Sequence, residues 1–199
     1  MLIGMCGVGG TGKTTAVNEL LKLIPDLAFQ PSIVRRFYEL RGVKSEVEYF
    51  RTMREDERLD FQVDLLDYYM RTTVEFVEAH PGQDVILDRT AFDHVAYAVY
   101  SNPSMSLGRL YSIMAYAEHF GKLDPLVFRF PYPVPWTGTA AAEDGFRKTD
   151  VGKNWLVDCA MQRVTRTYAP DAVLVPMGLP AERAAAMAEV INQRRGAHI

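Results

Sequence analysis

A glycine-rich stretch near the start of the chain carries the residues with the clearest chemistry. Residues 7–14 read Gly-Val-Gly-Gly-Thr-Gly-Lys-Thr. Glycines permit a tight loop whose backbone N–H groups converge on an anion, and a following helix adds the positive end of its dipole. Lys13, at the expected exposed start of that helix, would reach the β- and γ-phosphates of a nucleoside triphosphate, and the Thr14 hydroxyl would bind Mg²⁺. The expected ATP contacts from this stretch are Gly7, Gly9, Gly10, Thr11, Gly12, Lys13, Thr14 and Thr15.

A carboxylate and a guanidinium follow the apolar run at residues 85–87, as Asp88 and Arg89. If that run forms a strand beside the one that precedes the glycine loop, Asp88 can hold Mg²⁺ directly or through water. The planar fork of Arg89 suits two phosphate oxygens. Asp93 comes one helical turn later, where an acid either contacts a substrate or stabilises the start of a helix. The sequence leaves both roles of Asp93 open.

The segment 144–150, Asp-Gly-Phe-Arg-Lys-Thr-Asp, is a third candidate. It follows an irregular stretch with prolines at positions 131, 133 and 135, and loops of that length tend to be functional. Adjacent cations on a glycine-bearing loop could neutralise charge on a phosphoryl group in transfer. We therefore expect a lid-like segment over about 131–150, with Arg147 in a catalytic role and a solvated loop as the alternative.

Alternating apolar strands and helices must position these residues. We expect strands at residues 1–6, 27–29, 85–87, 126–130 and 172–175, separated by helices that include 13–23, 92–100, 107–120, 150–168 and 181–193. Such alternation is typical of parallel βαβ units with helices on both faces of one sheet. Ligands collect at the carboxyl ends of the strands in these sheets. The three candidate motifs at such ends are the glycine loop, Asp88-Arg89 and the loop after Val175.

Two further regions are predicted to be helical but carry no recognisable site motif. Residues 33–58 are rich in both signs of charge, with Gly42 as a break, and predict two exposed helices. Residues 61–79 predict a helix with one apolar face, made of Val63, Leu66, Met70, Val74 and Val77.

Composition limits the kind of protein this can be. The 199 residues fit one domain, 1–199, and the net charge of −3 gives no sign of a nucleic-acid-binding surface. No run approaches the ~18 apolar residues of a membrane span. The N-terminus lacks the basic region of a signal peptide. Cys6 and Cys159 form no disulfide or zinc pattern, so we expect a reducing cytoplasm.

Taken together, the motifs resemble a known family. The glycine loop, the span 86–90 with Asp93 and Ala96-Tyr97-Ala98 after it, and Asp144-Gly145-Phe146-Arg147 occur in this order. The pattern is similar to thymidylate-kinase-like and NadR-like P-loop kinases, including small phage-type deoxynucleoside monophosphate kinases. The resemblance implies a three-layer P-loop fold with five parallel strands in a kinase-like order. It also implies that Arg89 touches the acceptor phosphate, that Arg147 belongs to the lid and that the turn at Met177 holds the donor adenine.

One position departs from the related nucleoside kinases, whose second strand ends in a carboxylate that accepts the proton of the attacking hydroxyl. Here the corresponding stretch is Phe29-Gln30-Pro31-Ser32, and Gln30 cannot act as a base. A neutral 5′-hydroxyl benefits from a general base, whereas a monophosphate oxygen is already anionic. Gln30 therefore favours a monophosphate acceptor, with Arg35 and Arg36 as candidate sources of extra positive charge or, alternatively, exposed helix residues.

The sequence thus predicts a cytoplasmic nucleoside monophosphate kinase, in a host cytoplasm if phage-encoded, that uses ATP and Mg²⁺. The acceptor site would contain Arg89, Asp93, Gln30, Arg35 and Arg36, and Lys13, Arg89, Arg147 and Asp88 would be catalytic. A nucleoside kinase with Asp88 or Asp93 as base, and a non-kinase P-loop ATPase or switch, are the alternatives. Base identity and oligomeric state stay open, with a homodimer among the states allowed.

Overall fold

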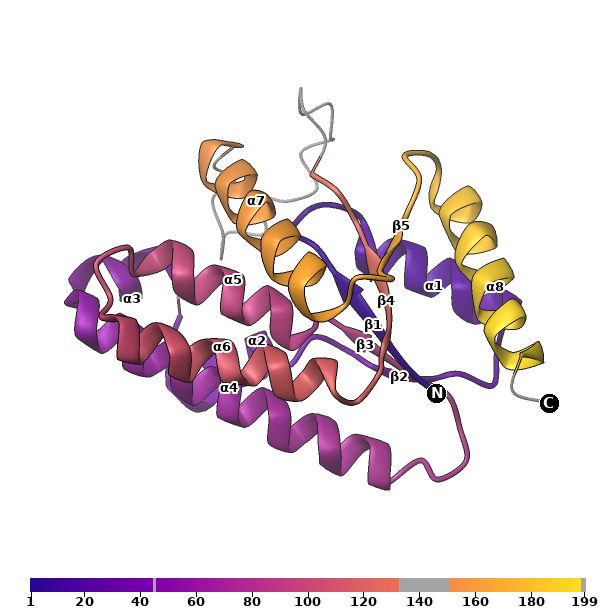
Figure 1. Cartoon of the computed structure of the whole chain (residues 1–199), viewed down its shortest axis with the longest axis horizontal. Coiled ribbons are helices and arrows are strands. Elements are labelled where there is room, and N and C mark those ends of the chain that lie inside the picture. The colour runs from indigo at the N-terminus through magenta and orange to yellow at the C-terminus, as the bar shows by residue number, and fades with distance from the viewer. Residues whose placement is uncertain (45, 133–150, 198–199) are drawn as a thin grey trace.

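Five parallel strands form the centre of the molecule (Figure 1). The computed structural model describes residues 1–44, 46–132 and 151–197. The strands lie in the order β2-β3-β1-β4-β5, which places β3 and β4 on either side of β1. Their bounds are β1 Leu2–Cys6, β2 Ala28–Gln30, β3 Val85–Asp88, β4 Leu126–Arg129 and β5 Val173–Leu174. The predicted five-stranded parallel sheet is therefore confirmed, with strand ends displaced by one or two residues.

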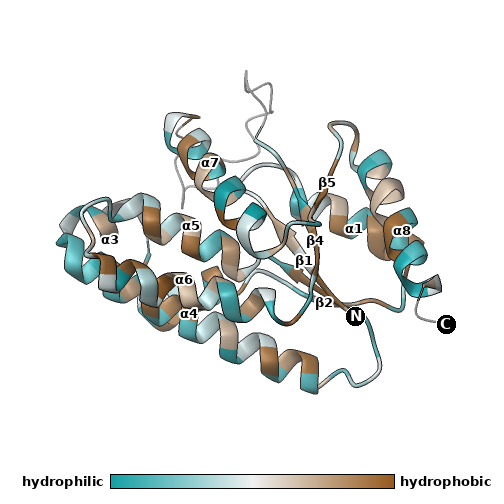
Figure 2. Cartoon of the chain, viewed as in Figure 1, coloured by the Kyte–Doolittle hydropathy of each residue, from teal (hydrophilic) through white to brown (hydrophobic). Residues whose placement is uncertain are grey.

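Helices cover both faces of this sheet, as predicted for a three-layer α/β fold. Their bounds are α1 Lys13–Leu23, α2 Val34–Leu40, α3 Glu46–Thr52, α4 Glu55–Glu78, α5 Ala91–Ser101, α6 Leu107–Gly121, α7 Val151–Tyr168 and α8 Pro180–Gly196. One apolar core joins α1 and α8 to one face of the sheet, and a second joins α4, α5, α6 and α7 to the other. Most helices carry hydrophobic residues on one side and hydrophilic residues on the other (Figure 2). Among the described residues, none of the helices has the length and hydrophobicity needed to cross a bilayer.

Sequence reasoning misplaced the start of α4 and the exposure of α2. Helix α4 begins at Glu55, six residues before the predicted start at Phe61, because the acidic residues that suggested an exposed helix form its first turn. Acids are favourable there, next to the positive end of the helix dipole, and the Glu57 carboxylate accepts a hydrogen bond from the Arg54 backbone N–H at 2.9 Å. Helix α2 is only half exposed, since Phe37 and Tyr38 are buried in a small aromatic core beside α4.

The apolar face predicted for α4 is also wrong in part. Its fully buried side includes Leu59, Leu65 and Tyr69, whereas Val74 and Val77 remain 46% and 39% exposed. The cause is that α4 packs against two cores at once, the sheet-facing core and the aromatic core of α2. A single-face pattern cannot describe a helix with two sets of neighbours.

Candidate active site

The glycine-rich stretch forms the connection between β1 and α1, at the carboxyl edge of the sheet. Gly12 is the residue before α1 and has φ 82°, a left-handed conformation that favours glycine. A side chain at Gly7 would bring its Cβ within 2.6 Å of the Phe130 carbonyl oxygen. The Thr11 hydroxyl donates to the Val8 carbonyl at 2.9 Å, and this hydrogen bond stabilises the turn between the two residues. We call residues 7–14 the phosphate loop.

Lys13 is buried within this loop and does not extend into solvent. Its side chain is directed back across the loop, and Nζ donates to the carbonyls of Gly7 and of Val8, the latter at 2.8 Å. The expectation that Lys13 lies at an exposed helix start is wrong, since the residue is only 6% exposed. Burial, with the Arg89 guanidinium nearby, lowers the pKa of Lys13 to about 8.

Thr14 and Asp88 come together because β1 and β3 are neighbours in the sheet, with Met5 opposite Asp88. The Thr14 hydroxyl donates to Asp88 Oδ2 at 2.9 Å, and Thr14 is exposed while Asp88 is half-buried. Hydroxyl and carboxylate oxygens are ligands that Mg²⁺ accepts. The described residues contain no cluster of three or more His, Cys, Asp or Glu side chains that could hold a metal alone. The pair supplies two oxygen-bearing side chains, so an ion bound there would take its remaining ligands from phosphates and water.

Arg89 lies at the end of β3 in a strained conformation. Its φ is 98°, in the left-handed region that a side chain rarely adopts. The guanidinium is buried, 3.7 Å from the Asp93 carboxylate and 5.6 Å from the centre of the Tyr97 ring. Burial by itself would lower the pKa of Arg89, but Tyr97, Asp93 and Asp88 outweigh that effect and raise it. The cation is thus held permanently charged beside the phosphate loop.

Asp93 connects the phosphate loop to α5. Its carboxylate accepts hydrogen bonds from the backbone N–H of Gly7 at 3.0 Å, from the backbone N–H of Thr90 at 2.9 Å and from the Thr90 hydroxyl at 2.7 Å. Asp93 is fully buried and is the third residue of α5, so it caps the helix start. Of the two roles left open by the sequence, these contacts favour the structural one.

Gln30 ends β2, opposite Leu87 of β3 and close to α4. Its Nε2 donates to the Thr72 carbonyl at 3.3 Å. Its Oε1 is buried and has no hydrogen-bond partner among the described residues. The nearby α4 also reaches the end of β3, where the Tyr69 hydroxyl donates to the Arg89 carbonyl at 3.1 Å. The amide predicted to replace a catalytic carboxylate therefore lies beside the same helix that contacts the Arg89 backbone.

The remaining predicted acceptor and catalytic residues are Arg35, Arg36 and Arg147. Arg35 and Arg36 lie on the exposed side of α2, opposite its buried Phe37 and Tyr38. Arg147 and most of the predicted lid-like segment lie outside the described residues. Their roles stay predictions.

Several residues of this region escaped sequence reasoning. Arg183 of α8 donates to the Thr11 carbonyl of the phosphate loop at 2.7 Å, and its Nη2 is 3.9 Å from the sulfur of Met177, the exposed residue predicted to hold adenine. A cation near the start of a helix is unfavourable next to the positive end of the helix dipole, and this was the feature of the sequence that could have drawn attention to Arg183.

Arg129, at the end of β4, forms a largely buried ion pair with Asp158 of α7 at 2.8 Å. Nothing local in the sequence joins that pair.

His94 of α5 is a further buried group near Arg89. Its ring centre is 4.9 Å from that of Tyr69, and its Nε2 has no hydrogen-bond partner among the described residues. Burial and the Arg89 guanidinium lower the pKa of His94 to about 3. The imidazole is therefore neutral at physiological pH.

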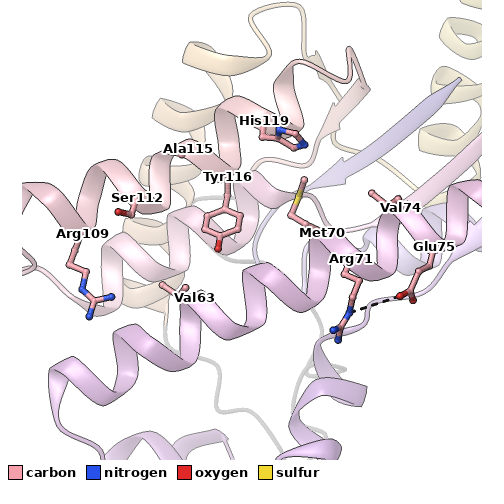
Figure 3. A pocket seen from close by; sticks show the side chains of 10 residues that line it. All are labelled: Val63, Met70, Arg71, Val74, Glu75, Arg109, Ser112, Ala115, Tyr116 and His119. Atoms are coloured by element: carbon pink, nitrogen blue, oxygen red, sulfur yellow. Dashed lines mark ion pairs between the residues drawn. The ribbon is translucent and has the colours of Figure 1, made fainter.

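An apolar groove of about 720 Å³ lies elsewhere, between α4 and α6 (Figure 3). It is lined by Val63, Met70, Arg71, Val74, Glu75, Arg109, Ser112, Ala115, Tyr116 and His119. None of these residues belongs to the phosphate loop or to a strand end. Part of the predicted apolar face of α4 lies in this groove, which is separate from residues 7–14.

Comparison of the sequence with protein-family models and with curated proteins finds no match. Solved structures do resemble it. Deoxyadenosine kinase from M. mycoides with bound dCTP has a TM-score of 0.67 at 14% identity, covering 96% of this chain and 100% of that one. NadR in complex with NAD and AMP-PNP has a TM-score of 0.61 at 15% identity, covering 96% of this chain and 48% of that one. Thymidylate kinase from Ehrlichia chaffeensis has a TM-score of 0.60 at 12% identity, covering 96% and 98%.

These neighbours share one fold. The present chain spans about half the length of NadR and nearly the full length of the other two. At such low identity the likeness concerns the fold, and the chain has the fold of the P-loop nucleotide and nucleoside kinases. The predicted strand order and helix layers agree with it.

Proposed function

We propose that this protein is a nucleoside monophosphate kinase that moves the γ-phosphoryl group of ATP onto a nucleotide, with a deoxynucleotide as the favoured acceptor. The observation that carries the proposal is the cluster at the carboxyl ends of β1, β2 and β3. A complete phosphate loop lies beside the Thr14–Asp88 pair, the buried Arg89 cation and an amide, Gln30, where a base would be needed for a hydroxyl acceptor. The neighbours that bind nucleotides support this reading.

On the donor side, the loop N–H groups and Lys13 would bind the β- and γ-phosphates. Lys13 now holds two loop carbonyls, so it would exchange those bonds for phosphate oxygens of higher charge. Thr14 and Asp88 would hold Mg²⁺, which neutralises charge on the phosphates. Met177 would contact the adenine, and Arg147 stays the predicted lid cation.

On the acceptor side, Arg89 would bind the monophosphate. An acceptor phosphate oxygen attacks the γ-phosphorus, the bond to the β–γ bridging oxygen breaks, and ADP leaves with its charge neutralised. No proton has to be removed when that oxygen is already anionic, so positioning and charge neutralisation supply the catalysis. The buried, permanently charged Arg89 suits this task, and an amide at position 30 does not impair it.

A nucleoside kinase is the second candidate, because deoxyadenosine kinase from M. mycoides has a TM-score of 0.67 to this chain. A 5′-hydroxyl would then need a carboxylate base. Both oxygens of Asp93 accept hydrogen bonds from Gly7 and Thr90, so Asp88 is the first candidate for the base. A non-kinase ATPase or switch, the third alternative, would hydrolyse ATP without an acceptor and respond to a protein partner.

The deciding experiment compares acceptors at fixed ATP and Mg²⁺. ADP release is followed with each common nucleoside and with its monophosphate, and kcat/KM is determined for both. We expect at least one monophosphate to react far faster than its parent nucleoside, since general-base assistance is worth about 10²–10⁴-fold to a hydroxyl. A nucleoside that proves the better acceptor would overturn the Gln30 argument. ATP hydrolysis unaffected by every acceptor would exclude both kinase readings.

Location and assembly complete the proposal. The buried Cys6 and the exposed Cys159 are both free thiols, which fits the reducing cytoplasm. A homodimer is compatible with the exposed apolar residues of α4 and α6.

A further inference from the structure

Arg183 connects two elements that are far apart in the sequence. It is the fourth residue of α8, yet its Nη1 donates to the carbonyl of Thr11 in the phosphate loop at 2.7 Å. A Cβ built on Gly12 would come within 3.2 Å of the same Nη1. The guanidinium therefore lies directly against the Thr11–Gly12 peptide bond.

This contact has a consequence for the direction of a loop N–H group. In a trans peptide the C=O and the N–H point in opposite directions. Because the Thr11 carbonyl points towards Arg183, the N–H of Gly12 in the same peptide points away from it. A cation at the oxygen also polarises the peptide and makes its N–H a stronger donor.

Side chains from two other segments of the chain lie against the Arg183 guanidinium. The guanidinium lies 5.9 Å from the centre of the Phe130 ring, and Nη2 is 3.9 Å from the Met177 sulfur. The next residue, Ala184, is fully buried in the core that joins α8 to α1 and the sheet. A cation this close to a helix N-terminus interacts unfavourably with the helix dipole. The hydrogen bond to the Thr11 carbonyl offsets that electrostatic cost.

Two other carbonyls of the loop have a different partner. Gly7 and Val8 direct theirs to Lys13, which belongs to the loop itself. Among these three carbonyls, Thr11 is the one held by a side chain from another element. The orientation of the Thr11–Gly12 peptide thus depends on α8.

We propose that Arg183 is a positioning residue of the donor site: it fixes the Thr11–Gly12 peptide so that the Gly12 N–H faces the bound phosphates. It acts through the peptide and not by contact with the nucleotide base. The inference rests on the ATP-binding part of the proposed function and is independent of the acceptor.

The test measures binding without any acceptor, so its failure is distinct from a failure of the kinase proposal. Calorimetry gives Kd for Mg²⁺-ATP and for Mg²⁺-triphosphate, the inorganic ion that has no base. Arg183→Met keeps an unbranched apolar side chain at this position and removes the donors. We expect it to weaken both ligands by the same factor, about 10- to 100-fold, the range for a lost hydrogen bond to a charged group. Arg183→Lys, which keeps a cationic donor, should recover much of that loss.

Two residues of the same helix serve as controls. Arg194→Met removes an exposed ion pair with Asp124 and should leave both Kd values unchanged. Arg195→Met breaks ion pairs with Asp26 and Asp84, so it should lower Tm without changing either Kd.

Three outcomes would overturn the proposal. Loss of ATP affinity with unchanged triphosphate affinity would make Arg183 a base contact. A lower Tm with both Kd values unchanged would show that Arg183 contributes to the stability of the fold and not to phosphate binding. If Arg183→Met does not fold, Arg183→Gln, whose shorter side chain cannot reach the Thr11 carbonyl, takes its place. Wild-type affinity for both ligands in a stably folded Arg183→Gln protein would contradict the mechanism.

Discussion

The donor and acceptor sides of the proposed site are built in different ways. On the donor side the groups of the phosphate loop are already engaged: Lys13 with loop carbonyls, Thr14 with Asp88 and Gly7 with Asp93. On the acceptor side, Gln30 Oε1 is buried without a hydrogen-bond partner among the described residues, and so is His94 Nε2, in a residue near Arg89. Buried polar atoms normally have partners, so unsatisfied ones need a reason.

The difference corresponds to what each side would bind. The polyphosphate chain is the same in every nucleoside triphosphate, so a rigid, preorganised loop suits it. Acceptors differ in base and sugar, and unpaired polar groups close to the site can discriminate between them, because a mismatched ligand leaves those groups unsatisfied. We therefore expect donor-side substitutions to abolish transfer and acceptor-side substitutions to change the acceptor.

The largest effect is expected for Lys13→Met. Methionine fills the buried space but has no charge for the phosphates, so kcat/KM should fall at least about 10²–10³-fold, as for the loss of one preorganised donor. Lys22→Met, on the exposed side of the same helix, removes only the ion pair to Glu19 and should be neutral. Steady-state kinetics and a thermal melt of each variant check this. Full turnover by a folded Lys13→Met protein would remove Lys13 from the site.

Gln30→Glu is expected to alter acceptor choice. A carboxylate at the end of β2 supplies the base that a hydroxyl needs and repels an anionic acceptor, so the ratio of nucleoside to monophosphate kcat/KM should rise about 10- to 100-fold, below the full worth of a general base. Gln30→Met, which removes the amide without adding charge, should not raise nucleoside turnover. An unchanged ratio in the Glu variant would mean that position 30 does not face the acceptor.

The pH dependence of ATP use gives a smaller, graded effect. Only the protonated ammonium of Lys13 attracts phosphates, and its pKa is lowered to about 8. Since kcat/KM for ATP reports the free enzyme, it should fall above pH 8, by up to about tenfold per pH unit. Profiles from pH 6.5 to 10, with Tm measured at each pH, separate this from unfolding. A decline that begins only near the usual lysine pKa, about 10.4, would contradict the burial of Lys13 in the active protein.

A last prediction concerns the stability of the folded protein in acid. His94 has a folded-state pKa of about 3, against about 6.5 for an unfolded chain, so the unfolded state binds more protons between these values. Stability is therefore fully present above pH 6.5 and decreases as the pH falls towards 3, by up to about 1.4 kcal/mol per pH unit. Urea denaturation between pH 4 and 7 should show a shallower decrease for His94→Phe than for wild type. The same change at the exposed His119 should leave the slope unaltered.

The sequence predicted those features that depend on short segments. The phosphate loop needs glycines at fixed spacing, and Asp88-Arg89 lies at the end of an apolar strand. Both are local patterns, and the parallel sheet brings them together because β1 and β3 are neighbours. The sequence also predicted most helix boundaries. The exception is the start of α4, whose acidic first turn was assigned to the preceding exposed helices.

Contacts between distant segments could not be predicted in this way. Arg183 reaches Thr11 across 172 positions, and Arg129 meets Asp158 across 29. Lys13 was expected in solvent because a helix start usually is, but its long side chain reaches back to the Gly7 carbonyl. Asp93 had two plausible roles, and only its three hydrogen bonds distinguish them.

The left-handed backbone of Arg89 has a consequence for the evolution and engineering of this protein. A non-glycine residue at φ 98° costs about 1–3 kcal/mol, and the surrounding fold must offset it. Glycine would relieve that strain, so Arg89→Gly should be more stable than Arg89→Ala although both lose the guanidinium. A selection for thermal tolerance alone would therefore drive this position towards glycine, and only a simultaneous selection for activity would keep the arginine.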